Sequence, residues 1–261
     1  LKGAPDPELP EASLFETGTN RWRSFDRWPP RDAQTRRLYF QPSGRLSFDA
    51  PPSSGKGFEE YRSDPAKPVP STDKIGIEMS GEHMTADQGF ASSRPDVLVF
   101  ETEPLAEDLT IAGPVTADLY VSTSGTDSDW VVKLIDVYPE DYPNPKPNPK
   151  EVEMRGYEQL VRGNVMRGKF RNSFEKPEPF TPGKPEHVRF ELNDTLHTFR
   201  KGHRVMVQVQ STWFPLVNRN PQVFTNIYNA PESAYRAADQ RVYHSASMPS
   251  SLIVPGEAGP R

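Results

Sequence analysis

Apolar and polar residues alternate along much of the second half of this 261-residue chain. Residues 188–192 read Val-Arg-Phe-Glu-Leu, so the apolar side chains take one face of an extended segment and the charged ones take the other. Residues 205–210 show the same period of two, which is the period of a half-buried strand. Strands are therefore predicted over residues 97–100, 112–122, 130–138, 154–164, 188–192, 205–210 and 252–254.

The first 95 residues carry a weaker pattern. Short strands are expected near residues 14–23, 37–40 and 46–48, separated by proline, glycine and serine clusters that form turns. Residues 71–95 show no clear periodicity. A stretch of that length without structure of its own is usually functional or lies in a contact between domains.

The connections decide the fold class. Residues 142–149 hold four prolines, which predicts an exposed loop or the end of a hairpin. Short helical turns are expected only at 193–201, closed by Gly202, and at 233–240. The 29 prolines exclude long uninterrupted helices. The pattern indicates an all-β fold, a jelly-roll β-sandwich with few short helices.

Charge and composition exclude several classes of partner. The net charge is −5, and the arginines between residues 21 and 37 are interleaved with Asp26 and Asp32, so no nucleic-acid groove is expected. No apolar run approaches the roughly 20 residues of a membrane helix, so no membrane span is expected. The absence of cysteine removes disulfides and thiolate chemistry, and it fits the cytoplasm and the periplasm equally.

The beginning of the chain suggests a domain boundary. It opens at Leu1 without methionine, and residues 1–12 read as a linker with several prolines and acidic residues. We expect residues 1–12 to be the linker from a missing upstream domain, and residues 13–261 to form one C-terminal β domain.

No catalytic site is evident. None of the 17 glycines is followed two residues later by serine, so Gly-x-Ser-x-Gly does not occur. The five histidines show no ligand spacing for a metal, and no glycine-rich phosphate loop is present. We therefore expect no catalytic residue, no metal and no cofactor in this chain.

Asp127 and Asp129 allow two interpretations. Clustered carboxylates suit Ca²⁺, a hard cation. Alternatively, these residues satisfy backbone donors in the turn before the strand at 130–138, and the lack of a third acidic residue nearby favours this structural role. We place both at a rim or a domain interface.

Two other segments hold candidate binding residues. Trp213 and Phe214 follow a strand. At the rim of a sandwich such rings can stack on sugars, but more often they seal the rim or pack on a neighbouring domain. The segment 81–90 mixes histidine, methionine, acid, amide and aromatic side chains, which suits a pocket wall. A lone histidine is more often a solvated or hydrogen-bonded loop residue. The candidate wall residues are His83, Met84, Asp87, Gln88 and Phe90.

Several segments, in one order, resemble a known enzyme group. They include Glu-Thr-Gly-Thr-Asn-Arg-Trp-Arg at 16–23 and Thr-Asp-Ser-Asp-Trp-Val-Val-Lys-Leu-Ile-Asp-Val-Tyr-Pro at 126–139. The others lie at 28–30, 63–70, 94–98, 202–211 and 213–221. Together they resemble the C-terminal jelly-roll domain, similar to galactose-binding modules, of the X-Pro dipeptidyl-peptidase and cocaine esterase group of serine hydrolases. The amino-acid sequence of these segments is most similar to that of α-amino-acid ester hydrolases, also called glutaryl-7-aminocephalosporanic acid acylases.

The resemblance implies a division of labour. The serine, aspartate and histidine that form the acyl-enzyme would belong to an upstream α/β-hydrolase domain, and this chain alone would be inactive. The jelly roll would pack on that domain and wall the active site that receives a small acyl substrate. Where relatives tend to have Asp-Gln-Arg, this chain has Asp87-Gln88-Gly89. The family favours a periplasmic or secreted location. A carbohydrate-binding module and a homo-oligomerisation domain remain alternatives.

Overall fold

The structure is a computed structural model that describes residues 9–53, 57–73, 81 and 83–256. Two strands, β1 (Ala12–Glu16) and β2 (Arg21–Phe25), form a separate antiparallel hairpin. Twelve strands form the large sheet: β3 (Gln34–Gln41), β4 (Arg45–Ser47), β5 (Phe58–Ser63), β6 (Leu98–Glu101), β7 (Leu109–Thr123), β8 (Asp129–Val137), β9 (Glu158–Arg167), β10 (Glu186–Phe199), β11 (Arg204–Gln210), β12 (Ala238–Ser245), β13 (Met248–Pro249) and β14 (Ser251–Gly256).

Helical structure is scarce in this part of the chain. The α-helix α1 (Gly89–Ser92) is a single turn. The 3-10 turns are η1 (Pro42–Gly44), η2 (Gly168–Phe170), η3 (Ile227–Asn229) and η4 (Glu232–Ala234). Among the described residues, no helix has the length and apolar character needed to cross a membrane.

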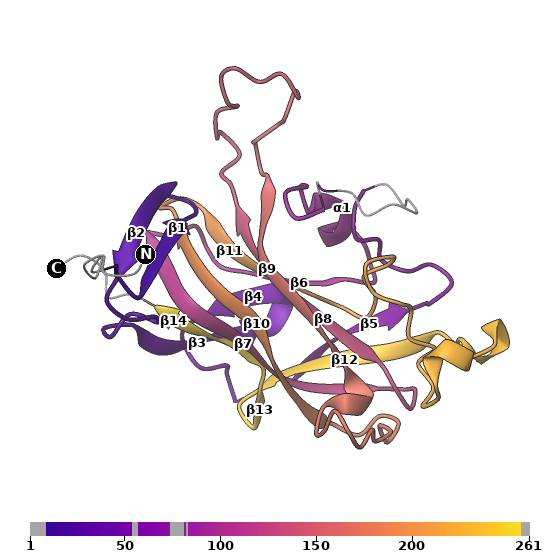
Figure 1. Cartoon of the computed structure of the whole chain (residues 1–261). Helices are drawn as coiled ribbons and strands as arrows, with labels where there is room; N and C mark the ends of the chain where they lie inside the picture. The colour runs from indigo at the N-terminus through magenta and orange to yellow at the C-terminus, as the bar shows by residue number, and fades with distance from the viewer. Residues whose placement is uncertain (1–8, 54–56, 74–80, 82, 257–261) are drawn as a thin grey trace, which may run out of the picture.

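The hydrogen-bonded order of the large sheet is β13-β12-β7-β14-β3-β4-β6-β11-β8-β9. The long strand β7 is its branch point, because it pairs with β10 along one edge and with β14 and β12 along the other. The described strand pairs are antiparallel, except that β4 and β6 run parallel. The strands curve into the two layers of a sandwich (Figure 1), which confirms the predicted all-β fold.

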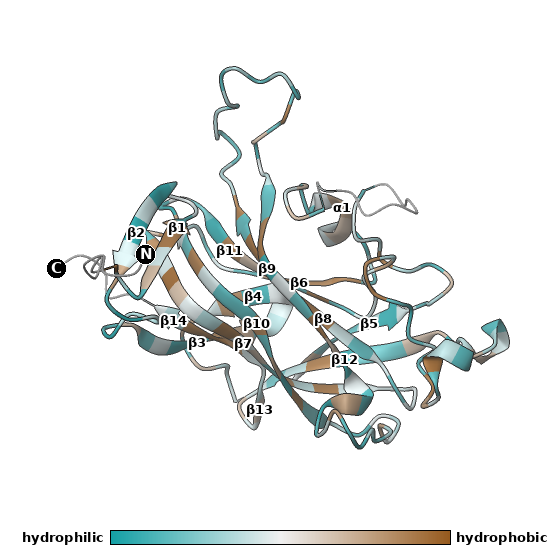
Figure 2. Cartoon of the chain, viewed as in Figure 1, coloured by the Kyte–Doolittle hydropathy of each residue, from teal (hydrophilic) through white to brown (hydrophobic). Residues whose placement is uncertain are grey.

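One hydrophobic core lies between the layers. It takes buried side chains from strands distant in sequence, such as Leu38 of β3, Phe100 of β6, Trp130 of β8, Val188 of β10 and Val207 of β11. Hydrophobic residues lie along these strands, whereas the loop between β8 and β9 is largely hydrophilic (Figure 2). That loop includes residues 142–149, which are exposed except for the half-buried Asn148, as the prolines predicted.

The prediction of two helical turns, at 193–201 and 233–240, is wrong. Residues 193–199 continue β10, after a register shift between Glu191 and Asp194. Both faces of β10 are buried beyond this bulge, because the β1–β2 hairpin covers Leu196. Burial on both faces removes the alternation that would have marked a strand. Residues 238–240 begin β12, whose pairing with β5 and β7 overrides local helix propensity, and only η4 is helical there.

A buried carboxylate ties three segments together. Asp136, near the end of β8, accepts hydrogen bonds from His197 Nε2 at 3.1 Å and from His203 Nδ1 at 2.8 Å. The other ring nitrogen of His197 lies 2.7 Å from the hydroxyl of Thr17, just after β1. Burial opposes ionisation of Asp136, but the hydrogen bonds from the two histidines outweigh it, and the pKa of Asp136 lies below its ordinary value. This contact fixes the N-terminal hairpin against the sandwich.

We expect Asp136→Asn to lower the free energy of unfolding at neutral pH by roughly 2–4 kcal/mol, because two buried imidazoles lose a charged acceptor. Since the folded-state pKa of Asp136 is depressed, its contribution is present at neutral pH and is lost as the pH falls below about 4. Urea unfolding at pH 7 and in acid measures both effects. Asp26→Asn, at an exposed carboxylate paired with Arg31, is the matched control and should change little. Equal losses in the two variants would contradict the role given to Asp136.

Candidate functional site

The segment 83–92 is held against the start of β9. The backbone N–H of Gln88 donates to the carbonyl of Glu158 at 3.0 Å, and the N–H of Glu158 donates to Asp87 Oδ1 at 3.1 Å. The hydroxyl of Ser92 donates to Glu158 Oε1 at 2.7 Å, and Tyr157 donates its hydroxyl hydrogen to the carbonyl of Thr85. The residues predicted as a pocket wall therefore have a fixed backbone instead of lying on a free loop.

The wall residues differ in exposure. Gln88 is fully buried, Phe90 and His83 are half-buried, and Asp87 is exposed. Met84 leaves 57% of its surface exposed. It lines a small cavity of about 370 Å³ together with Phe15 of the N-terminal hairpin. Met84 is thus the most exposed apolar side chain among the residues predicted as a pocket wall.

A buried lysine lies directly beneath this segment. Lys133 of β8 has no exposed surface, and its Nζ donates to Gln88 Oε1 at 3.0 Å and to Gln208 Oε1 at 3.5 Å. The Nζ also lies 5.7 Å from the ring centre of Phe90 and 5.4 Å from that of Trp213. Both predicted segments, 83–90 and 213–214, therefore meet around one side chain.

The environment of Lys133 favours its neutral form. Burial lowers the pKa of Lys133 to about 7, and the carboxylate of Glu158 only partly opposes this shift. Burial likewise raises the pKa of Glu158 to about 7, assisted by the charges of Asp87 and Glu101. A lysine and a carboxyl group at the base of the wall therefore change protonation near neutral pH.

Asp127 and Asp129 are buried, and both accept hydrogen bonds. Asp127 Oδ1 accepts from the backbone N–H of Ser128 at 2.9 Å and from that of Lys169 at 3.1 Å. Asp129 is bound by the Arg167 guanidinium through two bonds of 3.1 and 3.2 Å, and by Asn220 Nδ2 at 2.7 Å. Burial and the charge of Asp129 raise the pKa of Asp127 to about 6. This arrangement favours the turn-forming interpretation over Ca²⁺ binding.

No metal centre is visible in the described part of the chain, where no group of three or more histidine, aspartate or glutamate side chains could hold an ion. The two histidines beside Asp136 are its hydrogen-bond donors.

Trp213 is buried at 7% exposure, with its ring against Gly163 of β9. A Cβ at Gly163 would lie 3.1 Å from the Trp213 ring, so glycine permits this close approach. Phe214 is half-buried, and its backbone N–H donates to the carbonyl of Val69 at 3.0 Å. The Trp213 ring is thus part of the protein interior and offers no free face to a sugar.

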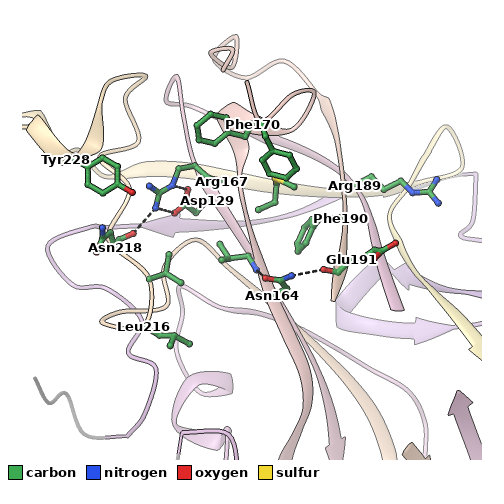
Figure 3. A pocket seen from close by; sticks show the side chains of 14 residues that line it. Asp129, Asn164, Arg167, Phe170, Arg189, Phe190, Glu191, Leu216, Asn218 and Tyr228 are labelled. Atoms are coloured by element: carbon green, nitrogen blue, oxygen red, sulfur yellow. Dashed lines mark hydrogen bonds and ion pairs between the residues drawn. The ribbon is translucent and has the colours of Figure 1, made fainter. Parts of the chain in front are cut away.

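A larger cavity lies beside the Asp129–Arg167 pair (Figure 3). Its volume is about 740 Å³, and strands β9 and β10, η2 and the loop at residues 216–218 form its walls. Arg167 lies at its base, where it also donates to the carbonyl of Asn218 at 3.3 Å. This cavity was not predicted from the sequence, because its lining comes from segments that only the fold brings together.

Lys133, Glu158 and Gln208 were also not predicted from the sequence as residues of the candidate site. One signal was available: Lys133 interrupts the run Val-Val-Lys-Leu-Ile in a predicted strand, and a lysine inside such a run must find partners in the interior. Glu158 and Gln208 gave no such signal, since they are ordinary polar residues in alternating strands.

The fold defines the class of this chain as a β-sandwich domain. The sequence family described as the X-Pro dipeptidyl-peptidase C-terminal non-catalytic domain matches residues 7–253. The chain belongs to this family.

Individual relatives agree with that assignment. The cocaine esterase of Rhodococcus sp. (strain MB1 Bresler) is 28% identical over 264 residues, which cover 98% of this chain and 43% of the esterase. The solved structure of an α-amino acid ester hydrolase is 45% identical, with a TM-score of 0.90, over 98% of this chain and 42% of that one. An aminopeptidase from a marine sediment Thaumarchaeota archaeon is 44% identical, with a TM-score of 0.90, over 99% and 42%. The chain therefore spans less than half the length of these relatives.

We expect the stability of the chain to depend on pH through Lys133. The folded-state pKa of about 7 lies below the unfolded value of 10.5, so between these values the unfolded chain binds the extra proton and stability rises with pH. Relative to Lys133→Met, the wild type should gain up to about 1.4 kcal/mol per pH unit in this range. Denaturant unfolding from pH 7 to 10 measures the difference, with the exposed Lys201→Met as control. Parallel curves for wild type and Lys133→Met would contradict this prediction.

Trp213→Ala should lower the free energy of unfolding by roughly 3–5 kcal/mol, because it leaves a cavity beside Gly163 and Lys133. Trp22→Ala removes a ring that is 70% exposed, and should cost less than about 1 kcal/mol. Chemical denaturation of both variants gives the comparison. A loss for Trp213→Ala no larger than that for Trp22→Ala would refute the interior role of Trp213.

Proposed function

We propose that this chain is the accessory β domain of a serine hydrolase that cleaves esters or amides of α-amino acids or related acyl groups. The observation that carries the proposal is the 45% identity to an α-amino acid ester hydrolase, along 98% of the chain and only 42% of that protein. The 44% identity to an aminopeptidase supports the same substrate class, since both names refer to an amino-acid acyl group.

The chemistry requires a partner domain. A serine nucleophile needs an activating histidine and a strained turn between strand and helix, and the Gly-x-Ser-x-Gly motif of such a turn does not occur in this sequence. In the proposal, residues 1–12 lead from an upstream α/β-hydrolase domain that holds the triad and forms the acyl-enzyme. Residues 13–261 pack on that domain.

The role of the chain in catalysis is to shape the entrance. The segment 83–92 is pinned to β9 through Glu158 and to β8 through Lys133, so its position is rigid. A rigid wall can exclude water and restrict the size of the acyl group without touching the reacting atoms. Met84, with its exposed thioether, is the residue we assign to this contact.

The test compares two polypeptides with a phenylglycine ester and with an acylated β-lactam. The chain alone should show no turnover, whereas the polypeptide extended upstream should hydrolyse one of them and lose activity with a serine-directed phosphonate. Turnover by the isolated chain that the phosphonate abolishes would overturn the proposal.

Within the extended polypeptide, Met84→Ala should change KM more than kcat, and the change should grow with the size of the acyl group. Met166→Ala, at a core methionine on β9, is the matched control that lowers stability without this dependence on substrate size. Identical kinetics for Met84→Ala and wild type with every substrate would remove Met84 from the entrance.

A further inference from the structure

The cavity beside the Asp129–Arg167 pair has aromatic rings that reach solvent. Phe174 is 79% exposed and Tyr228 is 80% exposed, and both line the cavity. The rings of Phe170 and Phe174 have centres 6.4 Å apart, so they form one aromatic wall. Figure 3 shows Tyr228 and Phe170 on either side of Arg167. Large aromatic rings exposed around one hollow are unusual for surface that meets only water.

The polar side chains of this cavity fall into two groups. At the base, Asp129 and Arg167 bind each other and have little freedom to reorient. At the rim, the side chains of Arg189 and Glu191 extend away from Arg167 and Tyr228 (Figure 3). The side chain of Asn218 makes no hydrogen bond or ion pair with any described residue. The same holds for the Tyr228 hydroxyl. The rim therefore offers donors and acceptors with unused capacity around a fixed base.

The charges in the cavity balance. The lining contains two arginines, Arg167 and Arg189, and two acidic residues, Asp129 and Glu191, so its formal charge is zero. A phosphate or a nucleic-acid strand would require an excess of positive charge. A neutral ligand with many hydroxyl groups fits better, because hydroxyls use both donors and acceptors.

Size and shape agree with such a ligand. The volume of about 740 Å³ lies within the range of small-molecule pockets. A pyranose ring presents flat faces of C–H groups, which pack on aromatic rings, and an edge of hydroxyls, which bond to planar amide, carboxylate and guanidinium groups. Both kinds of partner are present here: the rings of Phe174 and Tyr228, and the Asn218 amide.

We propose that this cavity binds a neutral pyranose sugar, as a free saccharide or as a unit of a glycan chain. Phe174 and Tyr228 supply the stacking surfaces, and the Asn218 side chain and the Tyr228 hydroxyl contact the sugar hydroxyls. This site differs from the sugar site expected from the sequence at Trp213, whose ring is buried. It is independent of the proposed hydrolase function.

The test titrates the chain with cellotetraose, chitotetraose and galactobiose, measured by calorimetry and by ligand-observed NMR. At least one should bind, and Phe174→Ala and Tyr228→Ala should each weaken that binding roughly tenfold or more. Both rings are exposed, so the unfolding midpoints of these variants should match the wild type. Trp22→Ala, at an exposed ring of β2 that lies outside this cavity, is the control and should bind normally.

Three results would overturn the proposal. One is the absence of binding by all three saccharides up to about 10 mM. Another is tighter binding of glucose 6-phosphate than of glucose, which would indicate an anion site. The third is strong protection from hydrogen exchange at residues 170–175 and 226–229 in the upstream-extended polypeptide, with loss of sugar binding, which would make this surface a contact between domains.

Discussion

The burial of β8 on both faces is the constraint on which the rest of this structure depends. Residues 129–136 are all buried, yet they include the charged residues Asp129, Lys133 and Asp136. A buried charge without partners would cost several kcal/mol, so each one must be satisfied by another part of the protein. Asp129 binds β9 and the loop after β11, Lys133 binds the segment before α1, and Asp136 binds β10 and the residue before β11.

This arrangement explains why an accessory domain can be rigid where its sequence has little regular structure. The segment before α1 carries no helix or strand signal, but Gln88 is fixed between Lys133 and Glu158. Buried polar contacts, instead of secondary structure, hold this segment in place. The same contacts make it sensitive to pH, since the pKa values of both Lys133 and Glu158 lie near neutrality.

Where the sequence was misleading, a tertiary contact was responsible. Residues 193–199 lost their alternation because the β1–β2 hairpin covers the outer face of β10, which leaves no polar face to alternate with. Trp213 follows a strand in a polar context, as a rim residue would, but the glycine at position 163 opens a place for its ring against β9. Single-sequence periodicity describes a strand with one wet face, and it fails where a second layer covers that face.

The sequence by itself determined the all-β class, the exposed proline loop, the absence of a serine nucleophile elbow and the family, since these follow from local periodicity, proline chemistry and motif order. It also marked the segments at 83–90 and 213–214. Only the tertiary structure decided that they meet at Lys133, that Asp127 and Asp129 lie in the interior, and that a cavity opens beside Arg167. The physical reason is that burial and charge pairing arise between residues far apart in the chain, and local sequence carries no record of which partner each buried charge will find.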